Sequence, residues 1–155
     1  MSARRRSSPL LTLATLIFGL TSCGGGGDDA PVAGPCVVRY AEPSLIISSV
    51  QNAATGAAIP VVSLSGITID GVAFNMAPLA AEARNVRAVG SALECTTACG
   101  FTVHEGAIAF TVSAPGFLPR SVAATGAYSS RSGNPGGCPL DLTGGNRINL
   151  SLTPG

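Results

Sequence analysis

The stretch Ala107-Ile108-Ala109-Phe110-Thr111-Val112-Ser113 decides the fold class of this chain. Its even-numbered positions are large and apolar, whereas its odd-numbered positions are small or hydroxylated. Because successive side chains of a β-strand point to opposite faces, this alternation predicts a strand with one buried face and one face in water. Residues 148–152 (Ile-Asn-Leu-Ser-Leu) repeat the pattern and predict a second such strand near the end of the sequence.

Short apolar and β-branched runs bounded by turn residues recur along the chain outward from this stretch. Asp70-Gly71 separates two of them and is a strong signal for a two-residue hairpin. Ala114-Pro115-Gly116-Phe117 predicts a type II turn, for which Gly116 supplies the positive φ. About seven short strands of this kind predict an all-β fold, an Ig-like antiparallel β-sandwich. The runs are residues 37–40, 44–50, 59–64, 67–69, 72–74, 107–113, 118–124 and 148–152.

Two segments depart from the strand pattern. In Pro78–Val89, the apolar residues Leu79, Ala83 and Val86 recur at helical spacing, which predicts a short helix or an irregular insertion. Residues 128–137 (YSSRSGNPGG) are polar and rich in turn residues, which predicts a long surface loop.

The beginning of the sequence predicts an export leader. Three arginines, Arg4 to Arg6, precede the apolar run 10–20 (LLTLATLIFGL), and a charged segment followed by an apolar run is typical of a secretory signal peptide. The run is too short for a membrane-spanning helix. We therefore expect residues 1–22 to be a cleaved signal peptide.

Leu20-Thr21-Ser22-Cys23 resembles the bacterial lipobox. The resemblance implies that the thiol of Cys23 receives a diacylglyceryl group, that Cys23 becomes the N-terminus after cleavage, and that acyl chains such as palmitate anchor the protein in a membrane. Gly24 follows the cysteine, and similarity to Gram-negative lipoproteins then implies sorting to the cell outer membrane. An ordinary signal peptide followed by a chance cysteine is the alternative.

Residues 24–35 contain five Gly, two Pro and two Asp. Such a composition cannot build a core and predicts a flexible spacer. A phosphate-binding loop is a poor alternative, because no strand precedes the glycines and no Lys-Ser/Thr pair follows them. The predicted organisation is thus a leader at 1–22, a lipidated cysteine and tether at 23–35, and one domain at 36–155.

The charge of the mature chain excludes one class of partner. Without the three leader arginines, six Arg remain against eight acidic residues, which gives a net charge of −2. Nucleic-acid-binding domains carry a basic surface, so we expect no nucleic-acid partner.

Three pieces of the domain together resemble the carboxypeptidase regulatory-like domain, an accessory module with a transthyretin-like β-sandwich. They are Thr55-Gly-Ala-Ala-Ile59, Asp70-Gly71 and Glu105-Gly-Ala-Ile-Ala-Phe-Thr-Val-Ser-Ala-Pro-Gly-Phe117, the last being the best match. Ile108 stands where the family usually has an aromatic residue. Despite its name, the family implies no peptidase activity and no catalytic residues.

Four cysteines remain in the domain: Cys36, Cys95, Cys99 and Cys138. An even number in a small exported domain predicts two disulfides, for which three pairings are possible. Our preferred pairing joins one of Cys95 and Cys99 to Cys138 and the other to Cys36. A zinc site is the alternative, but the spacing and the oxidising compartment favour disulfides, so we expect no metal and no cofactor.

No catalytic constellation is evident in the sequence, and we expect a protein that is not an enzyme. His104 is the single histidine, and the sequence shows no Ser or Cys nucleophile in a strained glycine turn that could pair with it. Asp70 and Glu94 are the candidate paired carboxylates, but nothing in the sequence brings them together. We expect His104 to decorate a tight turn formed with Glu105 and Gly106.

The leading hypothesis is a lipid-anchored envelope protein whose β-sandwich serves as an interaction or structural module for an unidentified protein partner. The alternative is a carbohydrate-binding module, since the transthyretin-like sandwich is similar to starch-binding-like domains. Tyr128, Arg131 and Asn134 are the candidate exposed cluster for binding a glycan. A third hypothesis is transport of a small hydrophobic ligand, which would require a cavity.

Overall fold

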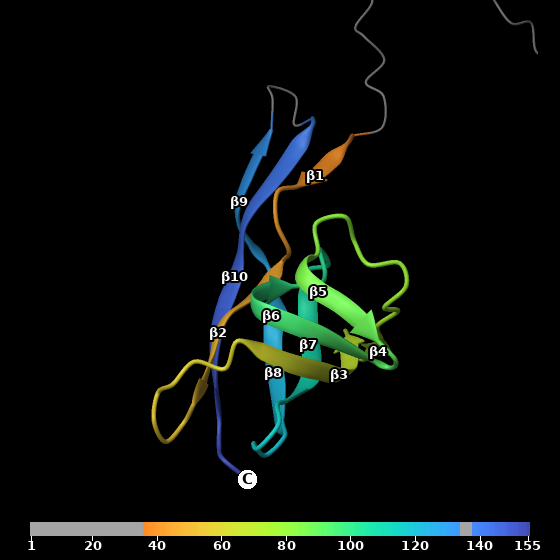
Figure 1. Ribbon diagram of the computed structural model, residues 1–155. Helices are drawn as coiled ribbons and strands as arrows, with labels where there is room; N and C mark the ends of the chain where they lie inside the picture. The colour runs from red at the N-terminus through yellow and green to blue at the C-terminus, as the bar shows by residue number, and fades with distance from the viewer. Residues whose placement is uncertain (1–35, 134–137) are drawn as a thin grey trace, which may run out of the picture. The chain divides into compact units, whose positions relative to one another are not determined.

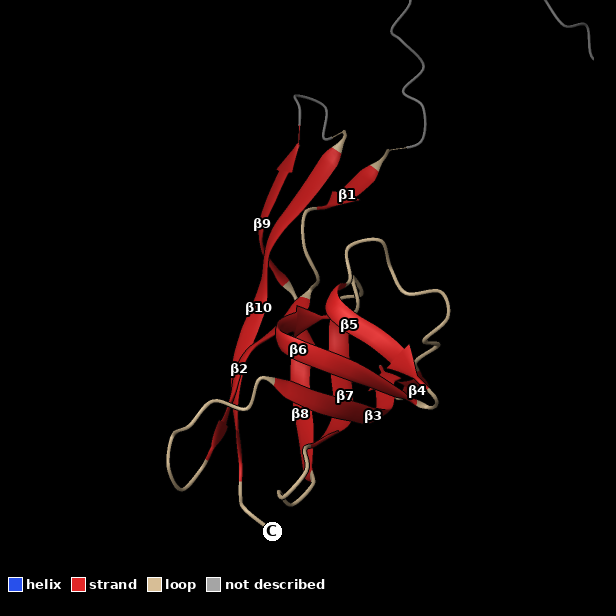
Figure 2. Ribbon diagram, in the orientation of Figure 1, coloured by secondary structure: helices blue, strands red, loops and turns tan. Residues whose placement is uncertain are grey.

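The computed structural model of the protein describes residues 36–133 and 138–155. Within them the chain is all-β: ten strands are joined by loops, and there is no helix (Figures 1 and 2). The predicted all-β class is therefore confirmed. The strands are β1 (Val38–Tyr40), β2 (Leu45–Asn52), β3 (Val61–Ile69), β4 (Val72–Ala73), β5 (Arg84–Val89), β6 (Ala92–Gly100), β7 (Gly106–Ser113), β8 (Arg120–Gly126), β9 (Tyr128–Gly133) and β10 (Leu140–Leu152).

The ten strands form one mixed sheet. Seven of them follow the order β1-β10-β2-β6-β3-β7-β8, and β4, β5 and β9 pair with β3, β6 and β10. β10 runs parallel to both β1 and β2, whereas all other pairs are antiparallel. The prediction that all strands are antiparallel is therefore wrong for β10, which lies between β1 and β2. Parallel strands need a long crossover connection, and here strands β3 to β9 form the connection between β2 and β10.

The sheet curls until its end strand β8 approaches β10. The backbone N–H of Leu118, just before β8, donates to the carbonyl of Thr153 at 2.9 Å, and the N–H of Asn146 donates to the carbonyl of Ala127 at 3.0 Å. Between these points, the Arg120 side chain donates to the Ser151 carbonyl at 2.9 Å. The two strands are thus held together at their ends and by a side chain, without a continuous backbone ladder.

The alternation that predicted β7 is present in the structure. Ile108, Phe110 and Val112 are 1%, 3% and 0% exposed, whereas the alternating small residues face outward. In β10, Leu150 and Leu152 are buried in the same way. These side chains join one core, which also contains Leu45, Ile47, Val50, Val62, Leu64, Leu93 and Phe101.

Both predicted turns are confirmed. Asp70 and Gly71 have φ of 50° and 79° and connect Ile69 to Val72, the first pair of the β3–β4 hairpin. Both central residues of a type I′ turn need positive φ, which explains the Asp-Gly sequence. At the second turn, Gly116 has a φ of 79° and the N–H of Phe117 donates to the carbonyl of Ala114 at 3.1 Å.

Of the two alternatives predicted for Pro78–Val89, the helix is wrong, and the irregular insertion is present only in its first half. Residues 84–89 form β5, which pairs with β6 through a two-residue turn at Gly90-Ser91, while residues 78–83 are irregular. Apolar spacing suggested a helix, but only Val86 of the strand is partly buried. The neighbouring strand satisfies the backbone of β5 and so decides its conformation, which the local pattern does not contain.

The predicted loop at 128–137 is also largely wrong. Residues 128–133 form β9, which pairs antiparallel with the first half of β10, and residues 134–137 lie outside the described part of the chain. After Tyr128, all residues of β9 are exposed. A strand exposed on both faces carries no apolar alternation, so its sequence looks like that of a polar loop.

Candidate functional site

The structure pairs the four cysteines of the domain as Cys36–Cys138 and Cys95–Cys99. The prediction of two disulfides is confirmed, whereas the preferred pairing is wrong. Cys36 and Cys138 precede β1 and β10, whose parallel register places Val38 opposite Leu140 and leaves the two cysteine Cα atoms 5.3 Å apart. This parallel pairing joins β1 to the first residues of β10, and no local sequence pattern predicts it.

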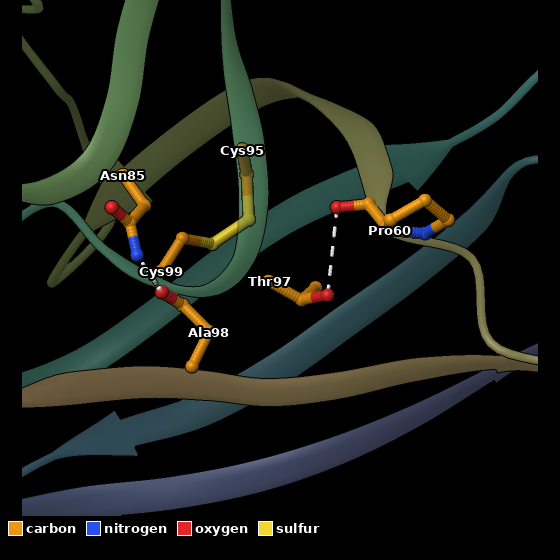
Figure 3. Close-up of a disulfide and its surroundings, with 6 residues drawn as sticks. All are labelled: Pro60, Asn85, Cys95, Thr97, Ala98 and Cys99. Carbon is orange, nitrogen blue, oxygen red and sulfur yellow. Dashed lines mark hydrogen bonds between the residues drawn. A yellow bond between two sulfur atoms is a disulfide. The ribbon is translucent and has the colours of Figure 1, made fainter.

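The second disulfide closes a small loop within β6, which we call the cystine loop (residues 95–99; Figure 3). In the β5–β6 pairing, Arg84 lies opposite Gly100 and Val86 lies opposite Cys95. A single residue of β5, Asn85, therefore faces four residues of β6. The extra residues bulge from the ladder, and the disulfide joins the two sides of the bulge.

Two neighbours hold the cystine loop in place (Figure 3). Asn85, with a φ of 54°, donates from Nδ2 to the Ala98 carbonyl at 2.7 Å. The Thr97 N–H donates to the Pro60 carbonyl at 2.9 Å, and the Thr97 hydroxyl, whose contact is drawn in Figure 3, donates to the same carbonyl at 3.5 Å. Cys95 and Cys99 are 0% and 1% exposed. Because a reactive cysteine needs access and a thiolate, this buried disulfide is suited to a structural role.

The cluster predicted for glycan binding is not an open platform. The Tyr128 side chain is buried, with 7% of the residue exposed, and its hydroxyl donates to the Glu42 carbonyl at 2.9 Å. Burial is the main reason that the pKa of Tyr128 is raised to about 12. Arg131 is engaged by Glu105 at 2.6 Å, and Asn134 lies outside the described residues. The expected exposed cluster is therefore wrong as regards Tyr128.

The carboxylates of the domain serve mainly as acceptors for the fold. Asp70 Oδ1 accepts the Ala107 N–H at 2.8 Å. Glu94 receives two hydrogen bonds from Arg87, which lower the pKa of Glu94. The structure thus gives the two candidate carboxylates, Asp70 and Glu94, separate partners. In residues 36–133 and 138–155, no group of three or more His, Cys, Asp or Glu is placed to hold a metal ion.

Glu42 is a structural residue that the sequence analysis missed. Its carboxylate accepts the N–H groups of Gly144 and Gly145 at 2.8 and 3.0 Å and pairs with Arg147 at 3.0 Å. The space is tight, because a Cβ on Gly145 would lie 1.9 Å from the Pro43 carbonyl oxygen. Glu42 therefore fixes the middle of β10, where the strand passes from β9 and β1 to β2.

One hollow of the described domain has a volume of about 480 Å³ and a mainly aliphatic and aromatic lining, and we call it the apolar cleft. Its walls come from the β3–β4 hairpin, the loop after β4 and the segment between β6 and β7. Two stretches of the chain, residues 69–80 and 101–104, build it, and the sequence does not show that they meet. The lining residues are Ile69, Val72, Ala73, Phe74, Asn75, Pro78, Leu79, Ala80, Phe101, Thr102, Val103 and His104.

His104 is exposed and lines this cleft; it lies in an irregular segment before β7 and not in the predicted tight turn. Its backbone is fixed on both sides: the N–H donates to Thr102 Oγ1 at 3.1 Å, and the carbonyl accepts a hydrogen bond from the Ser44 hydroxyl. These two hydrogen bonds fix the backbone of His104 beside the apolar cleft.

The predicted anchor cannot be followed in the structure. Residues 1–22, Cys23 and the tether lie outside the described residues. In the part that is described, no helix has the length and apolar character needed to cross a bilayer.

No family model matches the chain, and no curated protein or solved structure is significantly similar to it. The resemblance to the carboxypeptidase regulatory-like domain therefore stays a prediction from residues 55–59, 70–71 and 105–117.

Proposed function

We propose that the chain is a non-enzymatic, lipid-anchored protein of the cell envelope, sorted to the outer membrane, whose domain at 36–155 acts as an interaction or structural module. The observation that carries the proposal is that all four cysteines of the domain are in disulfides. Disulfides persist in exported proteins and are rare in the cytosol. This agrees with the signal peptide and lipobox expected from residues 1–23.

The position of the first disulfide suits a tethered domain. Twelve residues separate Cys23 from Cys36, and even a fully extended chain of that length spans at most about 40 Å. Cys36 is bonded to Cys138, at the start of the long strand β10. A pull on the tether would therefore act on a covalently closed end of the sheet instead of peeling β1 away.

The use of the acidic side chains supports a non-catalytic role. Glu42 accepts two backbone N–H groups, Asp70 accepts a third, and Glu105 pairs with Arg131. General acid–base catalysis requires a group within reach of a substrate proton. These carboxylates are already engaged in hydrogen bonds that hold the strands together.

The anchor is tested by fractionating cells that express the wild-type chain or Cys23→Ala. We expect the wild type in the membrane fraction with the added mass of a diacylglyceryl group and an acyl chain. The variant should be released or remain unprocessed, because it lacks the acceptor thiol. Ser22→Ala is the matched control, since alanine is equally small, and it should be processed normally. Membrane association of Cys23→Ala with an unchanged mass would contradict the lipid anchor.

The module role is tested by capture from the envelope of the source organism, with the oxidised mature chain as bait and the reduced chain as control. We expect one protein partner that is lost on reduction. Recovery of glycan without protein would support the carbohydrate alternative.

A further inference from the structure

The apolar cleft is continuous with the core of the domain. Phe101 lines it and is 1% exposed, so its ring belongs to the hydrophobic core as well. Phe74 meets Phe101 edge to face, with ring centroids 5.4 Å apart, and Phe101 meets Phe110 at 6.3 Å in the same manner. Edge-to-face ring contacts of this kind are favourable and give the cleft an aromatic wall.

The walls of the cleft are held by hydrogen bonds of the fold. The Phe74 N–H donates to the Ile67 carbonyl at 2.9 Å, which fixes the loop after β4 to β3. On the other side, Ser44 and Thr102 hold the backbone of His104. A cleft whose walls are already ordered requires little further ordering when a ligand binds.

Three polar side chains line the cleft, and two of them are used by the fold. Asn75 Oδ1 accepts the Ala77 N–H at 3.0 Å, and Thr102 Oγ1 accepts the His104 N–H at 3.1 Å. Among the described residues, no partner within hydrogen-bonding distance is found for the imidazole of His104, which is exposed at the rim. The cleft therefore combines an apolar interior with one polar group at its edge.

We infer that this cleft binds a small amphipathic molecule, with an aromatic or acyl body against Phe74 and Phe101 and one hydroxyl or carbonyl group hydrogen-bonded to His104. The volume of about 480 Å³ lies within the range of small-molecule sites, roughly 300–1,000 Å³, which are also mainly apolar with a few polar groups. No Asp, Glu, Lys or Arg side chain lines the cleft, so an uncharged ligand fits it best. The inference is independent of the proposed lipid anchor.

The first test is a fluorescence titration with the neutral probe N-phenyl-1-naphthylamine. The protein is the mature chain, residues 23–155, with Cys23→Ser, which leaves every described residue unchanged. Its two disulfides are verified first by intact mass before and after reduction. We expect saturable binding at one site, and a signal that rises without saturation would overturn the inference.

A matched pair of variants locates the site. Ala73 is exposed and lines the cleft, whereas Ala88 is exposed on β5 and does not line it. Ala73→Trp should fill the cleft and weaken probe binding at least tenfold, and Ala88→Trp should leave the affinity within twofold. Thermal unfolding of both variants shows whether the fold is kept. Equal binding by a folded Ala73→Trp variant would contradict the proposed position.

The role of His104 is tested by displacing the probe with 1-naphthol or with naphthalene. A single hydrogen bond corresponds to roughly a threefold to tenfold effect on affinity. His104→Ala should weaken displacement by 1-naphthol by that factor and leave displacement by naphthalene unchanged. If both competitors change equally, His104 does not contact the hydroxyl group and this part of the inference fails.

Discussion

The two disulfides of the domain have the same chemistry and different structural tasks. Cys36–Cys138 joins residues 102 positions apart, and neither cysteine is fully buried. Cys95–Cys99 joins residues four positions apart, and both cysteines are buried in the core. The first closes the domain by linking its first strand to its last, whereas the second closes a bulge within one strand.

This difference follows from how β6 and β10 are paired. The first half of β6 pairs with β3 and β5, and Cys99 then pairs with Ile47 of β2. The cystine loop lies where β2 replaces β3 as a partner of β6, while β5 pairs with β6 on both sides of the loop. β10 also changes partners, from β1 and β9 to β2, but there the adjustment is made by Gly144-Gly145 and Glu42. The chain thus stabilises one partner change covalently and the other by hydrogen bonds.

The largest expected effect comes from removing the long-range disulfide. Constraining a loop of about 100 residues stabilises a domain by about 4.7 kcal/mol through the entropy of the unfolded chain. The double variant Cys36→Ala/Cys138→Ala should therefore lose about 4–5 kcal/mol of unfolding free energy, measured by denaturant unfolding. A loss below about 1 kcal/mol would show that this disulfide does not constrain the unfolded chain.

Removal of the short-range disulfide should cost less. The same relation gives about 2 kcal/mol for a loop of five residues, to which lost packing of the buried sulfurs adds. We expect Cys95→Ala/Cys99→Ala to lose about 2–3 kcal/mol in the same measurement. If this variant were destabilised more than Cys36→Ala/Cys138→Ala, the ranking by loop length would be wrong.

Substitutions of Asn85, which holds the cystine loop, should have a smaller effect on stability than removal of either disulfide. Its left-handed backbone costs a typical residue about 1–2 kcal/mol, and its side chain bonds the loop at Ala98. Asn85→Ala removes the hydrogen bond to Ala98 and also the residue type that tolerates the left-handed backbone. Asn85→Gly removes only the hydrogen bond, because glycine tolerates this backbone. We expect unfolding free energies lower by about 1–2 kcal/mol for the alanine variant and by about half as much for the glycine variant. Equal losses would mean that the backbone conformation contributes nothing.

Tyr128, at the start of β9 and opposite Gly145 of β10, provides the smallest effect. Its pKa is about 12 in the folded protein and about 10 in an unfolded chain. Below pH 10 both states are neutral; above it the unfolded state loses its proton first, so stability falls between about pH 10 and 12. Tyr128→Phe should remove the loss of stability that Tyr128 causes in this pH range. At pH 7 it should lower the free energy of unfolding by about 1 kcal/mol, because one hydrogen bond is lost.

The check is denaturant unfolding of the wild type and Tyr128→Phe between about pH 9 and 12. Identical pH profiles would contradict the raised pKa of Tyr128.

The parts of the fold that sequence predicted are those determined locally. In β7 the alternation of apolar and small side chains is sufficient to predict the strand. At Asp70-Gly71 and Pro115-Gly116 the residue types are sufficient to predict the turns. β5 and β9 were missed because a distant strand, not their own pattern, gives them their conformation.

The candidate sites illustrate the same limit. Cysteine number predicted two disulfides, but the pairing depends on the parallel register of β1 and β10. Tyr128 looked like part of an exposed polar loop, yet the β9–β10 pairing buries its ring. The apolar cleft is assembled from residues 69–80 and 101–104, and the sequence does not indicate that apolar residues such as Phe74 and Phe101 face a common space.

The most direct test of the account is disulfide mapping during partial reduction of the native protein, with released thiols alkylated and identified by peptide mass. We predict that Cys36 and Cys138 are labelled first, while Cys95 and Cys99 stay protected until the domain unfolds, because their sulfurs are inaccessible. A cross-linked peptide that joins Cys95 or Cys99 to Cys138, or earlier labelling of Cys95 and Cys99, would contradict the two different tasks assigned to these disulfides.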